Sequence, residues 1–302
     1  MEREVQLFSI VVSTGDPVEV FFPGKDRIIV AYQKGYIPIF PADGQAGDWL
    51  ATDLLGDKLR GMMRVRFWND GLWEERLLVE AWGGVGDVRE DGVESLTHVQ
   101  LGPVRVVGVC KYHGSDRYLA LFHEGGEEEE LRTNGRIIAF CMQKDDAVVV
   151  DAVVVQESHY YHNRGVWVRF DGQLVKRYRL VEEGEVETGQ DTATILKRSG
   201  EVFLAKPTKS VGRLLADGAW AVGLSPDGSR LVMLLQKPMG WFWDFRLTSK
   251  PKEVIYELEA PSLNDLGIPI QQIILRISPD LRWAVLATQE YVAVLPVPEV
   301  EL

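Results

Sequence analysis

The sequence predicts an all-β protein that folds as a β-propeller, which is a ring of antiparallel sheets. The main observation is a tandem repeat between Trp220 and Val297, in which two apolar strands flank the tripeptide Ser-Pro-Asp and a third strand follows. Proline fixes φ at such a turn, and aspartate with a following glycine reverses the chain, so each copy indicates a hairpin. Three-stranded meanders repeated in tandem are typical of propeller blades. The sequence shows no amphipathic pattern of ordinary helix length.

Hairpin turns recur along the whole chain of 302 residues, each between two runs rich in aliphatic or aromatic residues. Seven turns give about 43 residues per unit, which matches the period of four-stranded blades. The intervals are uneven, so a propeller of six blades is the alternative to one of seven. We find no linker and expect a single propeller domain over residues 1–302. The turns lie near Gly24, Asp70, Gly114, Asp145, Gly200, Gly228 and Asp280.

The repeated units differ in how clearly their sequences predict a full set of strands. The first covers residues 18–44, and the second begins at Met63 but ends in a polar, glycine-rich stretch at 85–96 that predicts weak outer strands. An insertion at 157–164 interrupts the fourth unit. The fifth unit shows only two strands, joined at Ser199-Gly200. The sixth and seventh units are the two Ser-Pro-Asp copies.

The segment WFWDFRLTSKPKEVIYELEA resembles the third and fourth strands of a WD-repeat blade. Trp243-Asp244 stands where that family carries its Trp-Asp dipeptide, at the end of the third strand, and His98 lies near the position of its Gly-His dipeptide. The resemblance is specific in the last third of the chain, and propellers with YVTN-type repeats are similar as well. It implies blades around a central channel, Trp243 in the core, and an N-terminal strand that completes the last blade.

The residues at the two ends of the chain agree with that implied closure. Val5–Val12 reads as a strand that belongs to no unit, while the seventh unit stops after three strands at Pro296-Val297-Pro298. Pairing the two segments would remove two exposed sheet edges.

Charge and composition restrict the class of partner and the compartment. The formal net charge is −12 and the isoelectric point is near 5.0, so the surface repels phosphate backbones and direct nucleic-acid binding is disfavoured. No apolar run is long enough for a transmembrane helix, and the N-terminus lacks the pattern of a signal peptide. Cys110 and Cys141 lie in apolar runs and are interpreted as buried free thiols, which suit the cytoplasm.

The sequence offers little catalytic chemistry. His159 and His162 fall short of the three or four ligands that zinc needs, and no G-x-S-x-G motif is present. We therefore expect no cofactor and no enzyme activity. The alternative is a propeller hydrolase or lactonase whose central channel holds a metal through acids such as Asp145, Asp146 and Asp191.

We predict a non-catalytic interaction scaffold, a subunit or adaptor of a larger cytoplasmic complex whose partner is another protein. Aromatic residues near loop ends are the usual anchors of protein interfaces. Trp241, Phe242 and Trp243 alternate faces in one strand, so with Trp243 in the core Phe242 is expected to be partly exposed. The candidate partner-binding residues are His159, Tyr160, Tyr161 and His162 in the insertion, together with Trp73 and Phe242.

Overall fold

The computed structural model consists of β-strands and their connections throughout the residues that it describes. No helix occurs among those residues, and all strand pairings among them are antiparallel. The described residues are 5–10, 15–52, 62–69, 72–81, 84–97, 99–101, 104–106, 111–113, 116–123, 128–134, 149–153, 166–171, 174–177, 185–188, 192–196, 199–205, 213–260 and 273–299.

The first sheet is a meander that follows the predicted first unit. Its hairpin turn lies at Lys25-Asp26, as the sequence indicated, and Asp26 has a φ of 55°. The strands are β2 (Pro17–Gly24), β3 (Arg27–Tyr32), β4 (Gly35–Phe40) and β5 (Gln45–Ala46), with β6 (Leu50–Ala51) paired to β4.

A seven-stranded sheet joins strands of the second and fourth predicted units. The stretch at 84–96 forms two strands where the sequence predicted weak ones, because Val85 and Val88, which lie on opposite faces of the first of them, are both fully buried. The strand order is β10 (Gly92–Leu96), β9 (Gly84–Arg89), β8 (Leu72–Ala81), β7 (Met62–Asn69), β16 (Val149–Val153), β17 (Val166–Asp171) and β18 (Leu174–Arg177).

Two further sheets follow the third and fifth units. The fifth unit has four strands in place of the two that the sequence indicated, since short strands at 185–188 and 213–216 complete it. One sheet contains β11 (Val99–Leu101), β12 (Val104–Val106), β13 (Lys111–His113), β14 (Asp116–His123) and β15 (Glu128–Asn134); the other contains β19 (Glu185–Thr188), β20 (Ala193–Leu196), β21 (Val202–Ala205) and β22 (Arg213–Ala216).

The two Ser-Pro-Asp copies form separate sheets. The last sheet takes its fourth strand from the N-terminus, with Gln6 opposite Val294 and Ser9 opposite Tyr291. The predicted closure is therefore confirmed. The sheets are β23 (Ala219–Leu224), β24 (Arg230–Lys237), β25 (Gly240–Leu247) and β26 (Val254–Ala260), then β27 (Ile274–Ile277), β28 (Trp283–Ala287), β29 (Tyr291–Pro296) and β1 (Gln6–Ser9).

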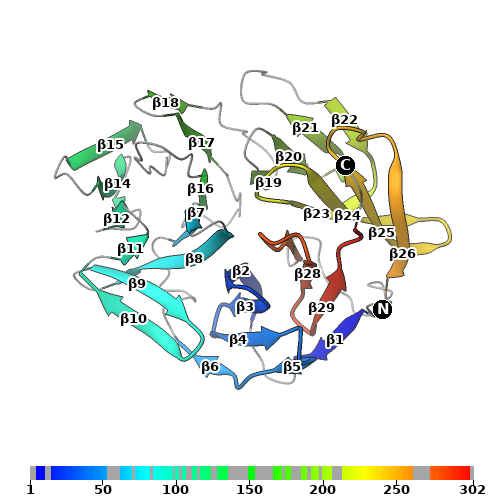
Figure 1. Ribbon diagram of the computed structural model, residues 1–302, viewed down its shortest axis with the longest axis horizontal. Helices are drawn as coiled ribbons and strands as arrows, with labels where there is room; N and C mark the ends of the chain where they lie inside the picture. The colour runs from blue at the N-terminus through cyan, green and yellow to red at the C-terminus, as the bar shows by residue number, and fades with distance from the viewer. Residues whose placement is uncertain are drawn as a thin grey trace.

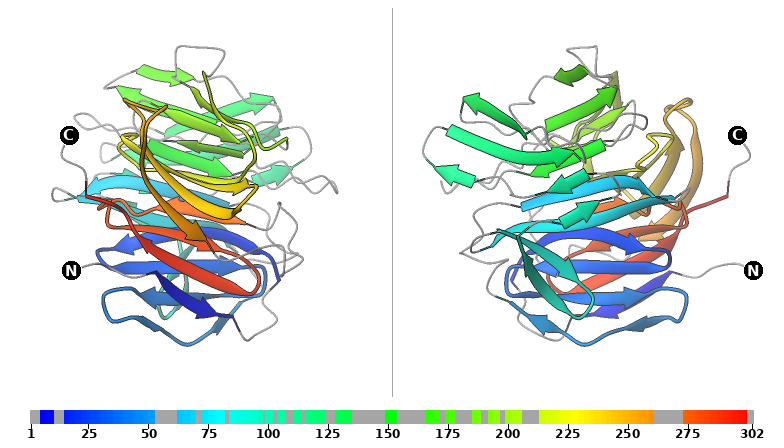
Figure 2. Two further views of the ribbon diagram at one scale, coloured as in Figure 1. Left: turned by 90° about the vertical axis from the view of Figure 1, so that its right-hand side faces the viewer. Right: turned by 60° about the vertical axis from the view of Figure 1, so that its left-hand side comes forward.

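The sheets are arranged around a ring (Figure 1). Strand β2 contacts β27 and β8, β27 contacts β23, β23 contacts β19 and β20, and β16 contacts β19 and pairs with β7, so the contacts close on themselves. The described strands form six sheets because the β7–β16 ladder joins two predicted units. Seven blades therefore stay a prediction. In the side views the first sheet lies next to the last sheet (Figure 2).

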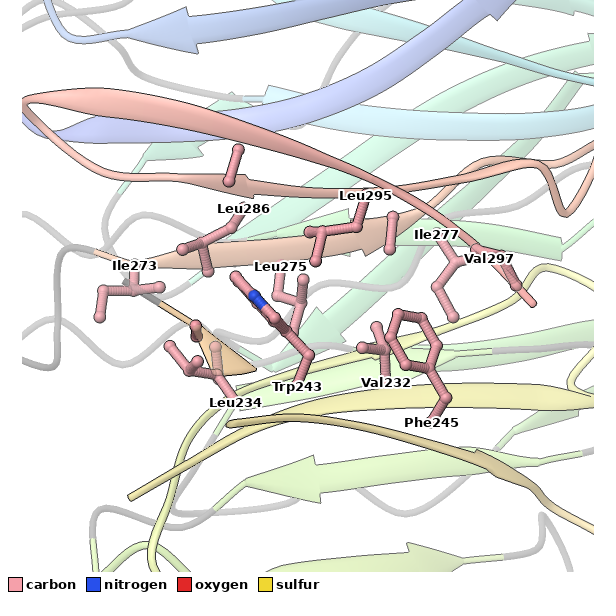
Figure 3. Close-up of a cluster of buried hydrophobic side chains, with 14 of the residues drawn as sticks. Val232, Leu234, Trp243, Phe245, Ile273, Leu275, Ile277, Leu286, Leu295 and Val297 are labelled. Atoms are coloured by element: carbon pink, nitrogen blue, oxygen red, sulfur yellow. The ribbon is translucent and has the colours of Figure 1, made fainter. Parts of the chain in front are cut away.

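Apolar side chains fill the space between neighbouring sheets. The cluster between β23–β26 and the last sheet surrounds Trp243, which is fully buried (Figure 3). Trp241 lies on the same face of β25 and is buried, whereas Phe242 on the other face is partly exposed. Both expectations for this strand are confirmed. At the ring interior Gly223 lets two backbones approach, since a Cβ there would meet the carbonyl oxygen of Leu275 at 3.0 Å.

Candidate functional site

The two Ser-Pro-Asp turns contain the same pattern of side-chain hydrogen bonds. In the β27–β28 turn the Ser278 hydroxyl donates to Asp280 Oδ1 at 2.6 Å and accepts from the backbone N–H of Trp283 at 2.9 Å. In the β23–β24 turn the Ser225 hydroxyl donates to Asp227 Oδ1 at 2.5 Å and accepts from the Arg230 N–H at 2.9 Å. In each turn the serine side chain thus accepts from a backbone N–H group that the chain reversal leaves without a partner in the strand ladder.

A pocket lies where the β27–β28 turn meets the β2–β3 turn of the neighbouring sheet. Its volume is about 290 Å³. Two aromatic side chains, both buried, form the apolar part of its lining. Charged side chains of both signs form most of the remainder, and the described lining holds neither histidine nor cysteine. The lining residues are Phe22, Gly24, Lys25, Asp26, Arg27, Glu74, Ser278, Pro279, Asp280, Arg282 and Trp283.

An ion pair across the two sheets fixes the shape of the pocket. Arg282 Nη1 lies 2.7 Å from both carboxylate oxygens of Asp26. The indole N–H of Trp283 donates to Asp26 Oδ1 at 3.2 Å. Because one carboxylate accepts from both residues, the first sheet is held to the last sheet at this point.

The rim of the pocket presents charge to solvent. Lys25 is exposed, and no described carboxylate lies within 4.0 Å of its ammonium group. Arg27 is also exposed and pairs with Glu90 at 2.7 Å. Asp280 Oδ2 is buried and accepts no hydrogen bond within the described part of the chain. The pocket can therefore hold a group that combines apolar surface with a charged or hydrogen-bonding end.

A second charged group lies deep inside the ring. Glu19 on β2 is 1% exposed, and its two oxygens accept from Arg276 on β27 at 2.8 and 3.2 Å. Arg64 on β7, also buried, lies 3.6 Å from Glu19. A buried carboxylate is stable only when it is paired, so this cluster ties three sheets together. We assign it a structural role.

The third strands of two sheets carry the same pair of an aspartate and an arginine two residues later. Asp244 is 1% exposed and receives two bonds from Arg246, at 2.7 and 2.8 Å. On β9, Asp87 is equally buried and accepts from Arg89 at 3.0 Å. Burial raises the pKa of the Asp87 carboxyl, and the guanidinium groups of Arg76 and Arg89 oppose that rise.

The Trp-Asp dipeptide occupies the middle of β25, whereas the sequence placed it at the end of the third strand. The strand continues through Leu247 because Phe245 and Leu247 still alternate onto a buried face. The aspartate is thus an internal strand residue that is paired with Arg246.

The predicted partner-binding residues are not brought together in the described structure. Phe242 lies on β25 with the Lys237 ammonium 5.2 Å from its ring centroid. Trp73 lies on β8 opposite Trp68, in a different sheet. His159, Tyr160, Tyr161 and His162 lie outside the described residues, as do Asp145, Asp146, Asp191, Cys110 and Cys141.

The described residues offer neither a metal site nor a membrane-spanning helix. They contain no group of three or more His, Cys, Asp or Glu side chains placed to hold a metal ion. They contain no helix that could cross a bilayer.

Sequence reasoning missed the pocket and the buried ion cluster. The two sides of the pocket are far apart in the chain: Asp26 and Arg282 are separated by 256 residues, and Glu19 and Arg276 by 257. The sequence contained one signal for the buried ion cluster, because Glu19 is a charged residue inside the apolar run VEVFF. Such a residue points either to solvent or to a buried partner, and the sequence does not name the partner.

Comparison with known proteins identifies the fold. No protein-family model and no curated protein matches the sequence. Among solved structures, the WD40 repeats of RRP9 superpose with a TM-score of 0.53 at 10% identity, covering 97% of this chain and 98% of that chain. The chain has the fold of a WD40-type β-propeller.

Two further solved structures match over similar lengths. BBS1N, solved in complex with ARL6DN, has a TM-score of 0.48 at 11% identity and covers 97% of this chain and 96% of its own. The propeller domain of Swd1 from Myceliophteria thermophila has a TM-score of 0.48 at 9% identity, with coverages of 96% and 99%.

Proposed function

We propose that the protein is a non-catalytic interaction scaffold that binds another protein as a subunit or adaptor of a larger cytoplasmic complex. The partner is held on the face of the ring that carries the β2–β3 and β27–β28 turns. The propeller provides a rigid support, and its turns provide the contacting side chains.

The pocket between these turns is the observation that carries the proposal. Its lining combines the aromatic side chains of Phe22 and Trp283 with a charged rim, which is the composition of a protein-interface anchor site. The Asp26–Arg282 pair holds both turns in place, so little order has to be gained on binding. The hydroxyl of Ser278 is engaged with Asp280 and with backbone N–H groups, which leaves it poorly placed as a nucleophile.

Loop 157–164 and the side chains of Trp73 and Phe242 are proposed as further contacts. They would enlarge the same interface, but the proposal does not depend on them. Loss of binding in Tyr160→Ala with Tyr161→Ala, at an unchanged melting temperature, would add the loop to the interface.

The proposal is tested by reversing the charge of the pocket rim. We expect Lys25→Glu with Arg27→Glu to lose the proteins that co-purify with the full-length wild type from its source cells. The melting temperature should change little, because both side chains are exposed and surface ion pairs contribute about 0–1 kcal/mol.

The matched control is Lys34→Glu with Arg213→Glu, which makes the same charge change at two exposed positions outside the pocket. Quantitative mass spectrometry of both eluates gives the readout. Equal retention of the partners by the two double variants would contradict the assignment of this face.

A further inference from the structure

Strand β26 is the last strand of its sheet in the described part of the chain, and it exposes apolar side chains. It pairs with β25 on one side, and the sheet order ends with it. Val254, Ile255 and Tyr256 are consecutive, and they are 44%, 37% and 45% exposed. Adjacent apolar residues that remain exposed beside charged ones are typical of interaction sites.

Acidic side chains accompany these apolar residues along the strand. Glu257 and Glu259 are both exposed. They lie on the face of the sheet that also carries Phe242, since Glu259 is opposite Phe242 in the ladder. Glu257 forms an ion pair with Lys237, while Glu259 has no cation within 4.0 Å among the described residues. The edge is thus apolar and negatively charged.

Other outer strands are shorter or more highly charged. Strands β1, β10 and β22 have four, five and four residues, against seven in β26. Strand β15 also has seven residues but reads EEELRTN, with four charged side chains. Charges and short length are the features that protect sheet edges from pairing, and β26 has them to a lesser degree.

The charges also indicate which occupant fits this edge. If a second copy paired with β26 in an antiparallel ladder centred on Leu258, Glu257 of one copy would lie opposite Glu259 of the other. Like charges directly opposite each other destabilise a sheet. A strand that carries lysine or arginine would instead place opposite charges across the ladder.

We propose that β26 receives an extended basic segment of a partner protein, which adds to the sheet as a fifth strand. The segment alternates apolar and basic residues, so that the apolar set packs beside Tyr256 on one face and the basic set pairs with Glu257 and Glu259 on the face that carries Phe242. The proposal rests on the protein being an interaction scaffold, but it uses a surface separate from the pocket.

The irregularity of β26 defines where the added strand pairs. Tyr256 lies opposite Phe245 and Val254 lies opposite Arg246, so Ile255 is an extra residue that forms a β-bulge. A bulge interrupts a regular ladder. The added strand therefore pairs along 256–259, and the exposed side chains of Val254 and Ile255 lie beyond its end.

The probe is an eight-residue peptide of alternating lysine and valine with blocked ends, titrated into the full-length protein at low salt. Two derivatives carry N-methyl groups, one on the lysines and one on the valines. An added strand turns alternate N–H groups toward β26, so one derivative should bind at least tenfold more weakly and the other should retain binding. A peptide that binds only by charge would lose nothing on either methylation.

Substitutions in the protein test the charge of the edge. Glu259→Lys should weaken binding of the lysine–valine peptide about threefold, and Glu290→Lys, at an exposed site on another sheet, should not. Tyr256→Lys should abolish binding without loss of the partners held at the pocket rim. That separation distinguishes failure of this proposal from failure of the proposed function.

Two results would overturn the proposal. The first is equal binding of both methylated peptides, or equal effects of Glu259→Lys and Glu290→Lys. The second is a dimer of the full-length protein in sedimentation that Tyr256→Lys dissociates, because the occupant of β26 would then be a second copy of this chain.

Discussion

The sheets β23–β26 and β27–β28–β29–β1 carry the same Ser-Pro-Asp turn but are completed in different ways. The first is continuous in sequence and ends in β26, whose side chains are largely exposed. The second borrows β1 from the other end of the chain. The two turns also differ at their left-handed residue, which is Gly228 with a φ of 72° in one and Leu281 with a φ of 60° in the other.

This difference shows what each part of the motif contributes. A leucine in the left-handed region is strained, and yet the turn at Leu281 keeps the same serine–aspartate network as the turn at Gly228. The side-chain hydrogen bonds therefore fix the turn, and glycine only lowers its strain. The origin of the fourth strand is decided by closure of the ring, since a turn acts only on its own hairpin.

The largest expected effect is at the contact between the two sheets. Trp243→Ala should lower the free energy of unfolding by about 3–5 kcal/mol, because Trp243 is fully buried among side chains from β27, β28 and β29. Chemical denaturation measures it. Phe242→Ala, on the half-buried face of the same strand, is the control and should cost clearly less. Equal losses for the two variants would mean that the sheets do not depend on this tryptophan.

Removal of residues 1–9 tests closure of the last sheet. The deletion takes away the ladder from Gln6 to Ser9 and leaves one edge of β29 unpaired. We expect a loss of about 2–4 kcal/mol from several backbone hydrogen bonds, and self-association through the free edge. Deletion of residues 1–4 alone keeps β1 and serves as the control. A truncated protein that melts like the wild type and remains monomeric would refute the closure.

The serine of each turn should contribute a smaller amount. Ser278→Ala and Ser225→Ala should each cost about 1–2 kcal/mol, since each removes a hydroxyl that both donates and accepts. The effect should be larger at Ser278, whose oxygen also accepts from the Arg282 N–H at 3.2 Å. Urea denaturation of both variants gives the comparison, and a larger loss at Ser225 would contradict this order.

Alkaline pH should affect the last sheet through Tyr291. Burial, followed by the charge of Glu290, raises the pKa of Tyr291 to about 12. Its unfolded value is about 10, so the neutral hydroxyl stabilises the fold below pH 10, and this stability is lost as the pH rises through 12. Tyr291→Phe should therefore flatten the fall in stability over this range.

Tyr256→Phe, which removes an exposed hydroxyl from β26, is the control for that experiment. Thermal melting across the alkaline range checks both variants. Identical pH profiles for Tyr291→Phe and the wild type would contradict the buried position of the Tyr291 hydroxyl.

Much of the fold could be predicted because hairpins are local. The turns near Gly24, Gly200, Gly228 and Asp280 lie where the sequence placed them. Proline, glycine and aspartate impose a turn within a few residues. The resemblance to a WD repeat implied that Trp243 lies in the core, and alternation then indicated that Phe242 is partly exposed. The outer strands of the second unit were underestimated from the sequence because glycine is unfavourable in strands, although Val85 and Val88 are fully buried there.

The candidate site could not be predicted, since it forms between residues that are distant in the chain. The pocket needs Asp26 beside Arg282, and its charged rim includes Lys25 and Arg27 from a turn that looks ordinary in sequence. Among the aromatic residues that were predicted to bind a partner, only Phe242 has a described side chain. It lies beside β26 and outside the pocket lining.

The sequence by itself determined the all-β class, the turns near Gly24, Gly200, Gly228 and Asp280, and the N-terminal strand that belongs to no unit, because these depend on local conformational preference and on alternation. Only the tertiary structure decided that β7 pairs with β16, that Arg276 neutralises Glu19, and that the apolar run Val254–Tyr256 faces solvent. The same run would be buried in a central strand. Whether a strand is central or outer depends on its neighbours in space, and the sequence of the strand does not contain them.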